Sequence, residues 1–208
     1  MKFELPKIYP ITDVFISKLS HLEQVELLIS GGAKLIQLRD KYAAPKDFYA
    51  AAKEVIKFAR PKKVKIIIND RVDIALAADA DGVHLGQDDL PPEQARKILG
   101  EKAIIGCSTH SIDQIAEAVK FPVDYLAIGP IFPTTSKENP ETVVGIEIIK
   151  EIRRVTGELP LVAIGGITFE NAASVFESGA DSIALISAIL NPSTQIVENI
   201  RKFYRAAC

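Results

Sequence analysis

The chain has little cysteine, no tryptophan and no long apolar run, and each absence excludes a class of protein. Its two cysteines, Cys107 and Cys208, are too few for a disulfide framework, and they form no zinc-type cluster with histidine. No apolar stretch approaches the roughly 20 residues that a bilayer span requires. The first residues, MKFELPKIYPITD, lack the apolar core and cleavage site of a signal peptide. We therefore expect a cytoplasmic protein.

The chain also lacks a strong excess of charge of either sign. It has 25 Lys and Arg against 27 Asp and Glu, a formal net charge of −2, and its pI is about 6.0. This balance gives no electrostatic footprint for nucleic acid or an anionic membrane, so we expect neither as a partner. With 208 residues, 48% of them hydrophobic, the length suits one large barrel as well as two small domains.

Short β-rich runs alternate with helix-period segments along the whole chain. In the segment 45–59, Phe48, Ala52 and Ile56 recur on one helical face. Near-continuous apolar runs, typical of parallel strands buried on both faces, lie at 8–12, 35–39, 65–69, 82–86, 104–108, 125–129, 161–165 and 182–186. Eight such units predict an α/β fold, a single (β/α)8 TIM barrel over residues 1–208. An open doubly wound sheet is the alternative, but no G-x-G-x-x-G follows the first run.

Two helix starts are predicted in detail. Ser111 is followed three residues later by Gln114, which matches a capping box. Thr168 follows a glycine pair, and we expect it to begin a helix.

Charged residues gather where predicted strands end, the edge at which α/β barrels carry their active sites. Asp70 ends the third run and Asp89 follows the fourth. Mg²⁺ is usually held by one or two carboxylates with water and substrate phosphates, so we predict a Mg²⁺ site there, with Asp88 an alternative ligand to Asp89. Arg39 and Lys41 end the second run and supply opposite charge. A plain salt-bridge network is the other interpretation.

A phosphate site is predicted after the seventh and eighth runs. Gly166 allows an anion to approach the main chain, and Ser187 adds a hydroxyl donor. Relief of crowding at the barrel rim is the alternative role for the glycine pair. The loop 131–144 is the longest polar connection, and four of its residues suit phosphoryl oxygens: Thr134, Thr135, Ser136 and Lys137.

The three histidines are not assigned to the chemistry. We expect His84 to pack inside its strand with a satisfied hydrogen bond, and His21 to be solvated on its helix. His110 lies near the rim without a nucleophile at recognisable spacing, and Cys107 is expected to be buried. Many anion ligands without a nucleophile elbow or an obvious base favour a reaction driven by departure of a charged group, with diphosphate binding supplying most of the catalysis.

Seven motifs run in order through almost the whole chain: YPITD (9–13), QLRDK (37–41), NDRVDIALAADADGVHLGQDD (69–89), GCSTHS (106–111), GPIFPTTSK (129–137), GGIT (165–168) and GADSIALISAI (179–189). Together they closely resemble the thiamine-phosphate synthase family, also called thiamine-phosphate pyrophosphorylase. The resemblance implies a (β/α)8 barrel that joins an aminopyrimidine-methyl diphosphate to a hydroxyethylthiazole phosphate. The implied products are thiamine monophosphate and pyrophosphate.

The resemblance also implies a role for each matching residue. The pyrimidine diphosphate would contact Gln37, Arg39, Lys41, Asn69, Ser108 and Lys137, of which Arg39, Lys41, Ser108 and Lys137 would be catalytic. The thiazole phosphate would contact Thr134, Thr135, Ser136, Gly166, Ile186 and Ser187. Asp70 and Asp89 would hold Mg²⁺. The partners are then two small-molecule substrates, and a homo-oligomer is left open.

Two other functions are alternatives to the synthase. Thiazole tautomerases share this barrel, but they are expected to lack the aspartate pair and to carry a histidine after the sixth strand, where this chain has Pro130. A non-catalytic thiazole-phosphate-binding protein would have no use for a metal site and a basic diphosphate cluster.

Overall fold

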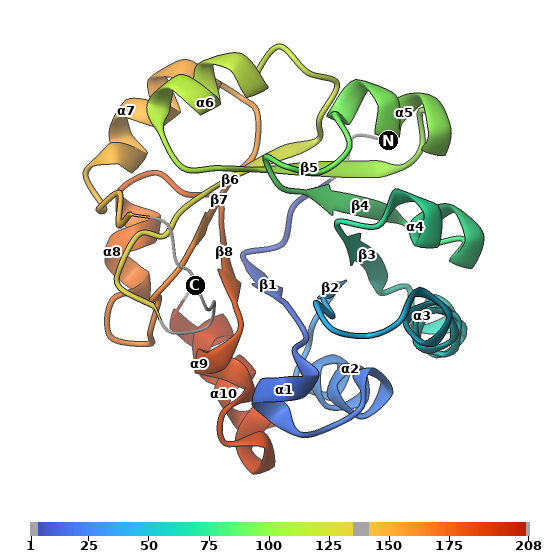
Figure 1. Cartoon of the computed structure of the whole chain (residues 1–208). Coiled ribbons are helices and arrows are strands. Elements are labelled where there is room, and N and C mark those ends of the chain that lie inside the picture. Colours follow the sequence, from blue (N-terminus) through green and yellow to red (C-terminus); the bar gives the residue numbers. More distant parts are fainter. Residues whose placement is uncertain (1–3, 135–141, 207–208) are drawn as a thin grey trace.

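The computed structural model of the chain describes residues 4–134 and 142–206. Its strands are β1 (Ile8–Pro10), β2 (Leu35–Leu38), β3 (Lys65–Asn69), β4 (Gly82–Leu85), β5 (Ile104–Thr109), β6 (Tyr125–Ile128), β7 (Leu161–Ile164) and β8 (Ser182–Leu185). All eight are parallel and pair in the order β1-β8-β7-β6-β5-β4-β3-β2 around one axis (Figure 1). A parallel bridge between Ile11 and Gln37 joins the two ends of this order. The predicted (β/α)8 barrel is confirmed.

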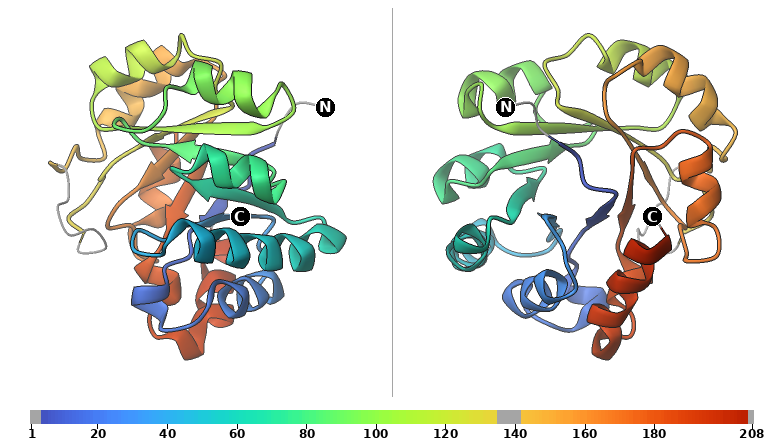
Figure 2. Two further views of the ribbon diagram at one scale, coloured as in Figure 1. Left: turned by 45° about the vertical axis from the view of Figure 1, so that its right-hand side comes forward. Right: turned by 180° about the vertical axis from the view of Figure 1, so that it is seen from behind.

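The helices lie outside the strands, as the views from the side and from behind show (Figure 2). None in the described ranges is long and apolar enough to cross a membrane. They are α1 (Val14–Ser17), α2 (His21–Ser30), α3 (Pro45–Ala59), α4 (Val72–Ala78), α5 (Pro92–Leu99), α6 (Ile112–Ala118), α7 (Ile148–Thr156), α8 (Ala172–Glu177), α9 (Ser187–Leu190) and α10 (Ile196–Ala206), with 3₁₀ turns η1 (Arg60–Lys62) and η2 (Ser193–Gln195).

The strand interiors are buried on both faces, as the apolar runs predict. Ile66, Ile67 and Ile68 of β3 are each at most 1% exposed, although successive side chains point to opposite faces. One face fills the barrel and the other packs beneath the helices. The sequence therefore marks each strand by a run of apolar residues rather than by alternation.

The helix start predicted at Ser111 is confirmed except for one half of its capping box, and the start predicted at Thr168 is wrong. Ser111 Oγ accepts from Gln114 N at 3.2 Å, but Gln114 Oε1 accepts from His110 N at 2.7 Å, so the reciprocal half of the capping box reaches one residue further back. Thr168 does not begin a helix: its N–H donates to Asn171 Oδ1 at 2.8 Å. This bond holds a turn, and α8 begins only at Ala172.

The prediction of a solvated His21 is wrong. The residue is 5% exposed, because it lies on the inner face of α2. Its Nδ1 lies 2.8 Å from Thr12 Oγ1 and its Nε2 lies 3.4 Å from Asp40 Oδ2. The helical pattern of α2 does not reveal this, because both partners come from other segments.

Candidate functional site

The site lies where the carboxyl ends of the strands meet, and its first half is formed by β2, β3 and the loop after β4. Arg39 follows β2, and its Nη1 donates to Asp13 Oδ2 at 2.7 Å. Both side chains are largely buried, 13% and 11% exposed. Asp13 Oδ1 also accepts from Ile16 N at 3.0 Å and so caps α1. The guanidinium is thus fixed at the rim by a carboxylate that the sequence analysis did not identify.

Lys41 and Asp70 form the next charged pair, with Nζ and Oδ2 2.5 Å apart. Asp70 adopts the left-handed region, φ 63°, and its N–H donates to His84 O at 2.8 Å. A non-glycine residue in this region is uncommon, and Asp is among those that tolerate it. The backbone turn at the end of β3 therefore places the Asp70 carboxylate beside the lysine.

Asp89 lies close enough to Asp70 for the two carboxyl groups to interact electrostatically. Its Oδ2 also accepts from Gly86 N at 2.7 Å. Burial raises the pKa of Asp89 to about 6, the negative charge of Asp70 adds to the rise, and Lys41 opposes it. Asp88 is exposed. The structure thus brings together two of the three aspartates predicted near the metal, in an arrangement that a cation would stabilise.

These two carboxylates fit a site for a hard cation such as Mg²⁺. Within residues 4–134 and 142–206, no cluster of three or more His, Cys, Asp or Glu residues could hold a metal by itself. Mg²⁺ commonly takes one or two carboxylates and completes its shell with water and substrate phosphates. The donor set therefore suits a cation that arrives with a phosphorylated ligand better than a permanently caged one.

A chain of polar side chains crosses the barrel interior below this rim. Gln37 Nε2 donates to Tyr9 Oη at 3.0 Å, and Tyr9 Oη lies 2.9 Å from Tyr125 Oη. His84 Nδ1 lies 3.0 Å from Tyr125 Oη, and His84 Nε2 lies 2.8 Å from Ser108 Oγ. The expectation of a packed, hydrogen-bonded His84 is confirmed.

Asn69 ends β3 and Cys107 lies on β5, with β4 between the two strands. Asn69 is half-buried at the end of β3, with its Cα paired to that of His84. Cys107 is 4% exposed, as expected. Burial raises the pKa of its thiol to about 11, and the charges of Asp89 and Glu93 add to the rise. A buried thiol of this kind is a poor nucleophile.

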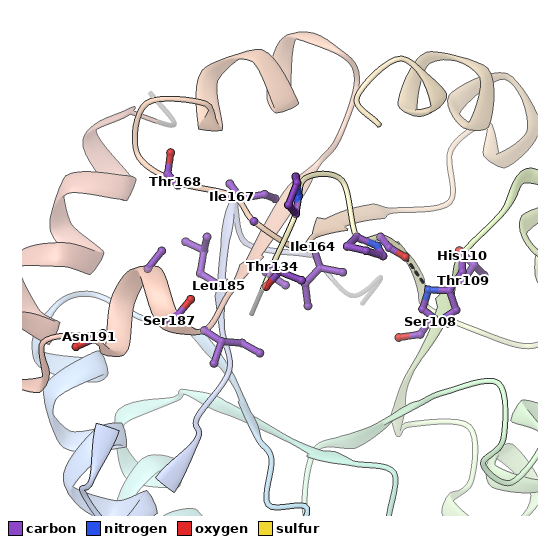
Figure 3. Close-up of a pocket in the computed structure, with 18 residues that line it drawn as sticks. Ser108, Thr109, His110, Thr134, Ile164, Ile167, Thr168, Leu185, Ser187 and Asn191 are labelled. Carbon is purple, nitrogen blue, oxygen red and sulfur yellow. Dashed lines mark hydrogen bonds between the residues drawn. The ribbon is translucent and has the colours of Figure 1, made fainter. Parts of the chain in front are cut away.

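The second half of the site is a cavity of about 480 Å³ over the ends of β5 to β8. Figure 3 shows Ser187 and Asn191 on one side and Ser108 and His110 on the other, with Thr134 between them. Five predicted residues line it: Ser108, Thr134, Gly166, Ile186 and Ser187. Thr135, Ser136 and Lys137 lie outside the described residues.

Gly165 and Gly166 bring two loops close together beside the cavity. Both have positive φ, 99° and 63°. A Cβ on Gly166 would lie 2.4 Å from Pro133 O, and one on Gly165 would lie 2.5 Å from Pro130 Cβ. The glycine pair therefore relieves crowding at the barrel rim, which was the alternative interpretation of the sequence. Both glycines also line the cavity.

Several lining residues were not among the predicted ligands, and they include His110, Pro130 and Asn191. His110 Nδ1 lies 2.6 Å from Gly129 O, which holds the ring against the end of β6. His110 and Pro130 belong to motifs quoted above, but Asn191 carries no signal in the sequence, because only the path after α9 brings it to the cavity.

Comparisons with known proteins identify the family of the chain. A family model described as thiamine monophosphate synthase matches residues 8–189. The thiamine-phosphate synthase of Koribacter versatilis is 45% identical over 194 residues, covering 90% of each chain. That of Clostridium novyi is 47% identical over 186 residues, covering 88% of this chain and 90% of the relative. A solved thiamine phosphate pyrophosphorylase from Pyrococcus furiosus has a TM-score of 0.86 and 36% identity, covering 97% of this chain and 95% of that one.

These relatives carry the name of the synthase, so neither the thiazole tautomerase nor the non-catalytic binder is favoured. The family match spans all eight strands. The chain belongs to the thiamine monophosphate synthase family and is a transferase of thiamine biosynthesis.

Proposed function

We propose that the two halves of the site bind the two substrates of a thiamine-phosphate synthase. The β2–β4 half takes the aminopyrimidine-methyl diphosphate, and the cavity takes the hydroxyethylthiazole phosphate. The observation that carries this proposal is the position of Ser108. It lines the cavity and also ends the polar chain that begins at Gln37, so the two halves meet at one residue.

The diphosphate half is suited to stabilise a departing pyrophosphate. Arg39 and Lys41 lie on the same rim, and each is already paired with a carboxylate that holds its position. Preorganised positive groups are most effective where negative charge develops during the reaction. The C–O bond between the methylene carbon and the diphosphate breaks, and the leaving group takes the electron pair.

Asp70 and Asp89 would hold Mg²⁺ in the same half. When bound, this ion supplies further neutralisation of the diphosphate charge. The chain's own residues bind and orient the substrate, and Ser108 donates its hydroxyl to a phosphoryl oxygen.

The cavity half positions the second substrate for bond formation. Thr134, Gly166, Ile186 and Ser187 would hold the phosphate of the thiazole, whose ring nitrogen then faces the methylene carbon. The electron-rich aminopyrimidine stabilises the methyl cation, and the nitrogen lone pair forms the new C–N bond. No general base is required, because the attacking nitrogen carries no proton.

The direct test is an assay with both substrates and Mg²⁺, in which thiamine monophosphate and pyrophosphate are quantified by chromatography. We expect equal amounts of the two products and none when either substrate is omitted. Chelation of the metal should stop the reaction, and added Mg²⁺ should restore it. Absence of product from folded protein that still binds the thiazole phosphate would overturn the proposal.

A further inference from the structure

A series of hydrogen-bonded polar side chains inside the barrel connects two residues that are predicted to contact substrate, Gln37 and Ser108. It runs from Gln37 through Tyr9, Tyr125 and His84 to Ser108 in four hydrogen bonds of 2.8 to 3.0 Å. The Tyr9 and Tyr125 rings pack edge to face with centroids 5.8 Å apart, and His84 stacks on Tyr125 at 5.5 Å. The intervening groups are therefore held in place by ring packing as well as by hydrogen bonds.

Burial makes the direction of each hydrogen bond matter. Tyr9 is 1% exposed, Gln37 is 2% exposed and Tyr125 is 0% exposed. Burial also raises the pKa of both phenols, so each keeps its proton. A buried hydroxyl proton without an acceptor costs free energy comparable to a lost hydrogen bond. Each phenol must therefore pass its single proton to a neighbour.

The donor at one end then sets the donor at the other. Gln37 Nε2 donates to Tyr9, so the Tyr9 proton goes to Tyr125 and the Tyr125 proton goes to His84 Nδ1. An imidazole that accepts at Nδ1 carries its proton on Nε2. That proton goes to Ser108 Oγ, which leaves the serine's own proton for a ligand.

We infer that this series of hydrogen bonds is polarised from Gln37 toward Ser108. Tyr9, Tyr125 and His84 are then positioning residues that couple its two ends. Ser108 presents a proton, and Gln37 retains its carbonyl oxygen as an acceptor. If Gln37 turned its amide over, every bond would reverse and Ser108 would present a lone pair instead. The two ends can change only together.

This polarity specifies the ligand. It selects a molecule with a hydrogen-bond donor, such as an exocyclic amine, at the Gln37 end and an anion at the Ser108 end. The assignment of these ends to one substrate rests on the proposed function, because the aminopyrimidine diphosphate carries both groups. A ring with a carbonyl in place of the amine would bind poorly, because its carbonyl oxygen and the Gln37 oxygen are both hydrogen-bond acceptors.

Nitrogen NMR of the ligand-free protein tests the polarity independently of the enzymatic reaction. Protein labelled with ¹⁵N-histidine is examined at about pH 8, where an ordinary histidine is neutral, and His84→Gln identifies the signals of His84. We expect the tautomer protonated on Nε2. In Tyr125→Phe the donor to Nδ1 is lost, and the Nδ1-protonated form should increase. Tyr9→Phe is the matched control and should leave the tautomer unchanged, because Tyr125 keeps its proton. A wild-type His84 protonated on Nδ1, or no response to Tyr125→Phe, would overturn the inference.

Kinetics provide the second readout. Tyr125→Phe should lower kcat/KM for the pyrimidine diphosphate about five- to tenfold, the size of one neutral hydrogen bond. The KM for the thiazole phosphate should hardly change, and circular dichroism should confirm folding. An equal effect on both substrates would contradict a positioning role. Failure of the synthase assay with the expected tautomer would instead overturn only the proposed function.

Discussion

Asp13 and Arg39 form a largely buried ion pair between the loop after β1 and the end of β2, with Oδ2 and Nη1 2.7 Å apart. The same carboxylate caps α1 through Ile16 N. One aspartate thus fixes a helix start and the guanidinium proposed to bind the diphosphate.

Asp13→Asn should therefore reduce both stability and catalysis. Loss of the charge leaves a largely buried guanidinium without a counterion, which we expect to cost about 1–3 kcal/mol of unfolding free energy. Urea denaturation measures this change, and kcat/KM for the pyrimidine diphosphate measures the displacement of Arg39. Asp73→Asn is the control, because the exposed Arg71–Asp73 pair should contribute at most about 1 kcal/mol. Equal losses for the two variants would show that burial of the Asp13 pair has no special role.

The aspartates after β4 should differ sharply in function. Asp89→Ala should abolish turnover, because it removes half of the proposed metal site, and it should leave thiazole-phosphate binding largely intact. Asp88→Ala is the matched control on the adjacent exposed residue, and its turnover should stay close to that of the unaltered protein. Calorimetric titration with the thiazole phosphate, together with the synthase assay, separates the two effects. Loss of turnover in the Asp88 variant would make Asp88 a metal ligand instead.

His21 should make the protein less stable in mild acid. Burial lowers its pKa from 6.5, and the charge of Asp40 opposes this shift only in part. Below pH 6.5 the unfolded chain therefore binds a proton that the folded protein does not, so stability falls as pH falls from 6.5 through the folded-state pKa. Urea denaturation across this range should show a weaker pH dependence for His21→Gln than for the unaltered protein. Identical slopes would mean that His21 is not buried in its neutral form.

Gly166 should be required for packing of the cavity wall. Gly166→Ala places a Cβ 2.4 Å from Pro133 O at a φ of 63°, so the loop after β6 must move. Gly157→Ala is the control, since its φ of 55° also imposes strain but no atom lies within 4 Å. We expect the Gly166 variant alone to weaken thiazole-phosphate binding at least tenfold by titration. Equal affinity in the two variants would remove Gly166 from the proposed phosphate site.

Much of the rim could be predicted because parallel strands in a barrel present their carboxyl ends at one mouth. Asp70 and Asp89 belong to neighbouring strands, so their approach follows from the order of the strands. Ser108, Gly166 and Ser187 line one cavity for the same reason. The roles of these residues stay predictions until the substrates are tested.

Contacts across the barrel could not be predicted from the sequence. Tyr9 and Tyr125 are 116 residues apart, and their hydroxyls meet only because β1 and β6 face each other through the interior. Gly106 makes room for the Tyr125 ring, since a Cβ there would lie 2.0 Å from Cζ. A glycine inside an apolar strand signals close packing, but it does not name the residue that packs against it.

The sequence by itself determined the eight strands, their order along the chain and the chemical groups at their ends, because local apolar runs and strand-end residues carry that information. The tertiary structure alone decided that Asp13 holds Arg39, that His21 is buried and that a polarised hydrogen-bond chain links Gln37 to Ser108. These relationships depend on the register and facing of distant strands, and hydrogen bonds form only where that geometry brings donor and acceptor within about 3 Å.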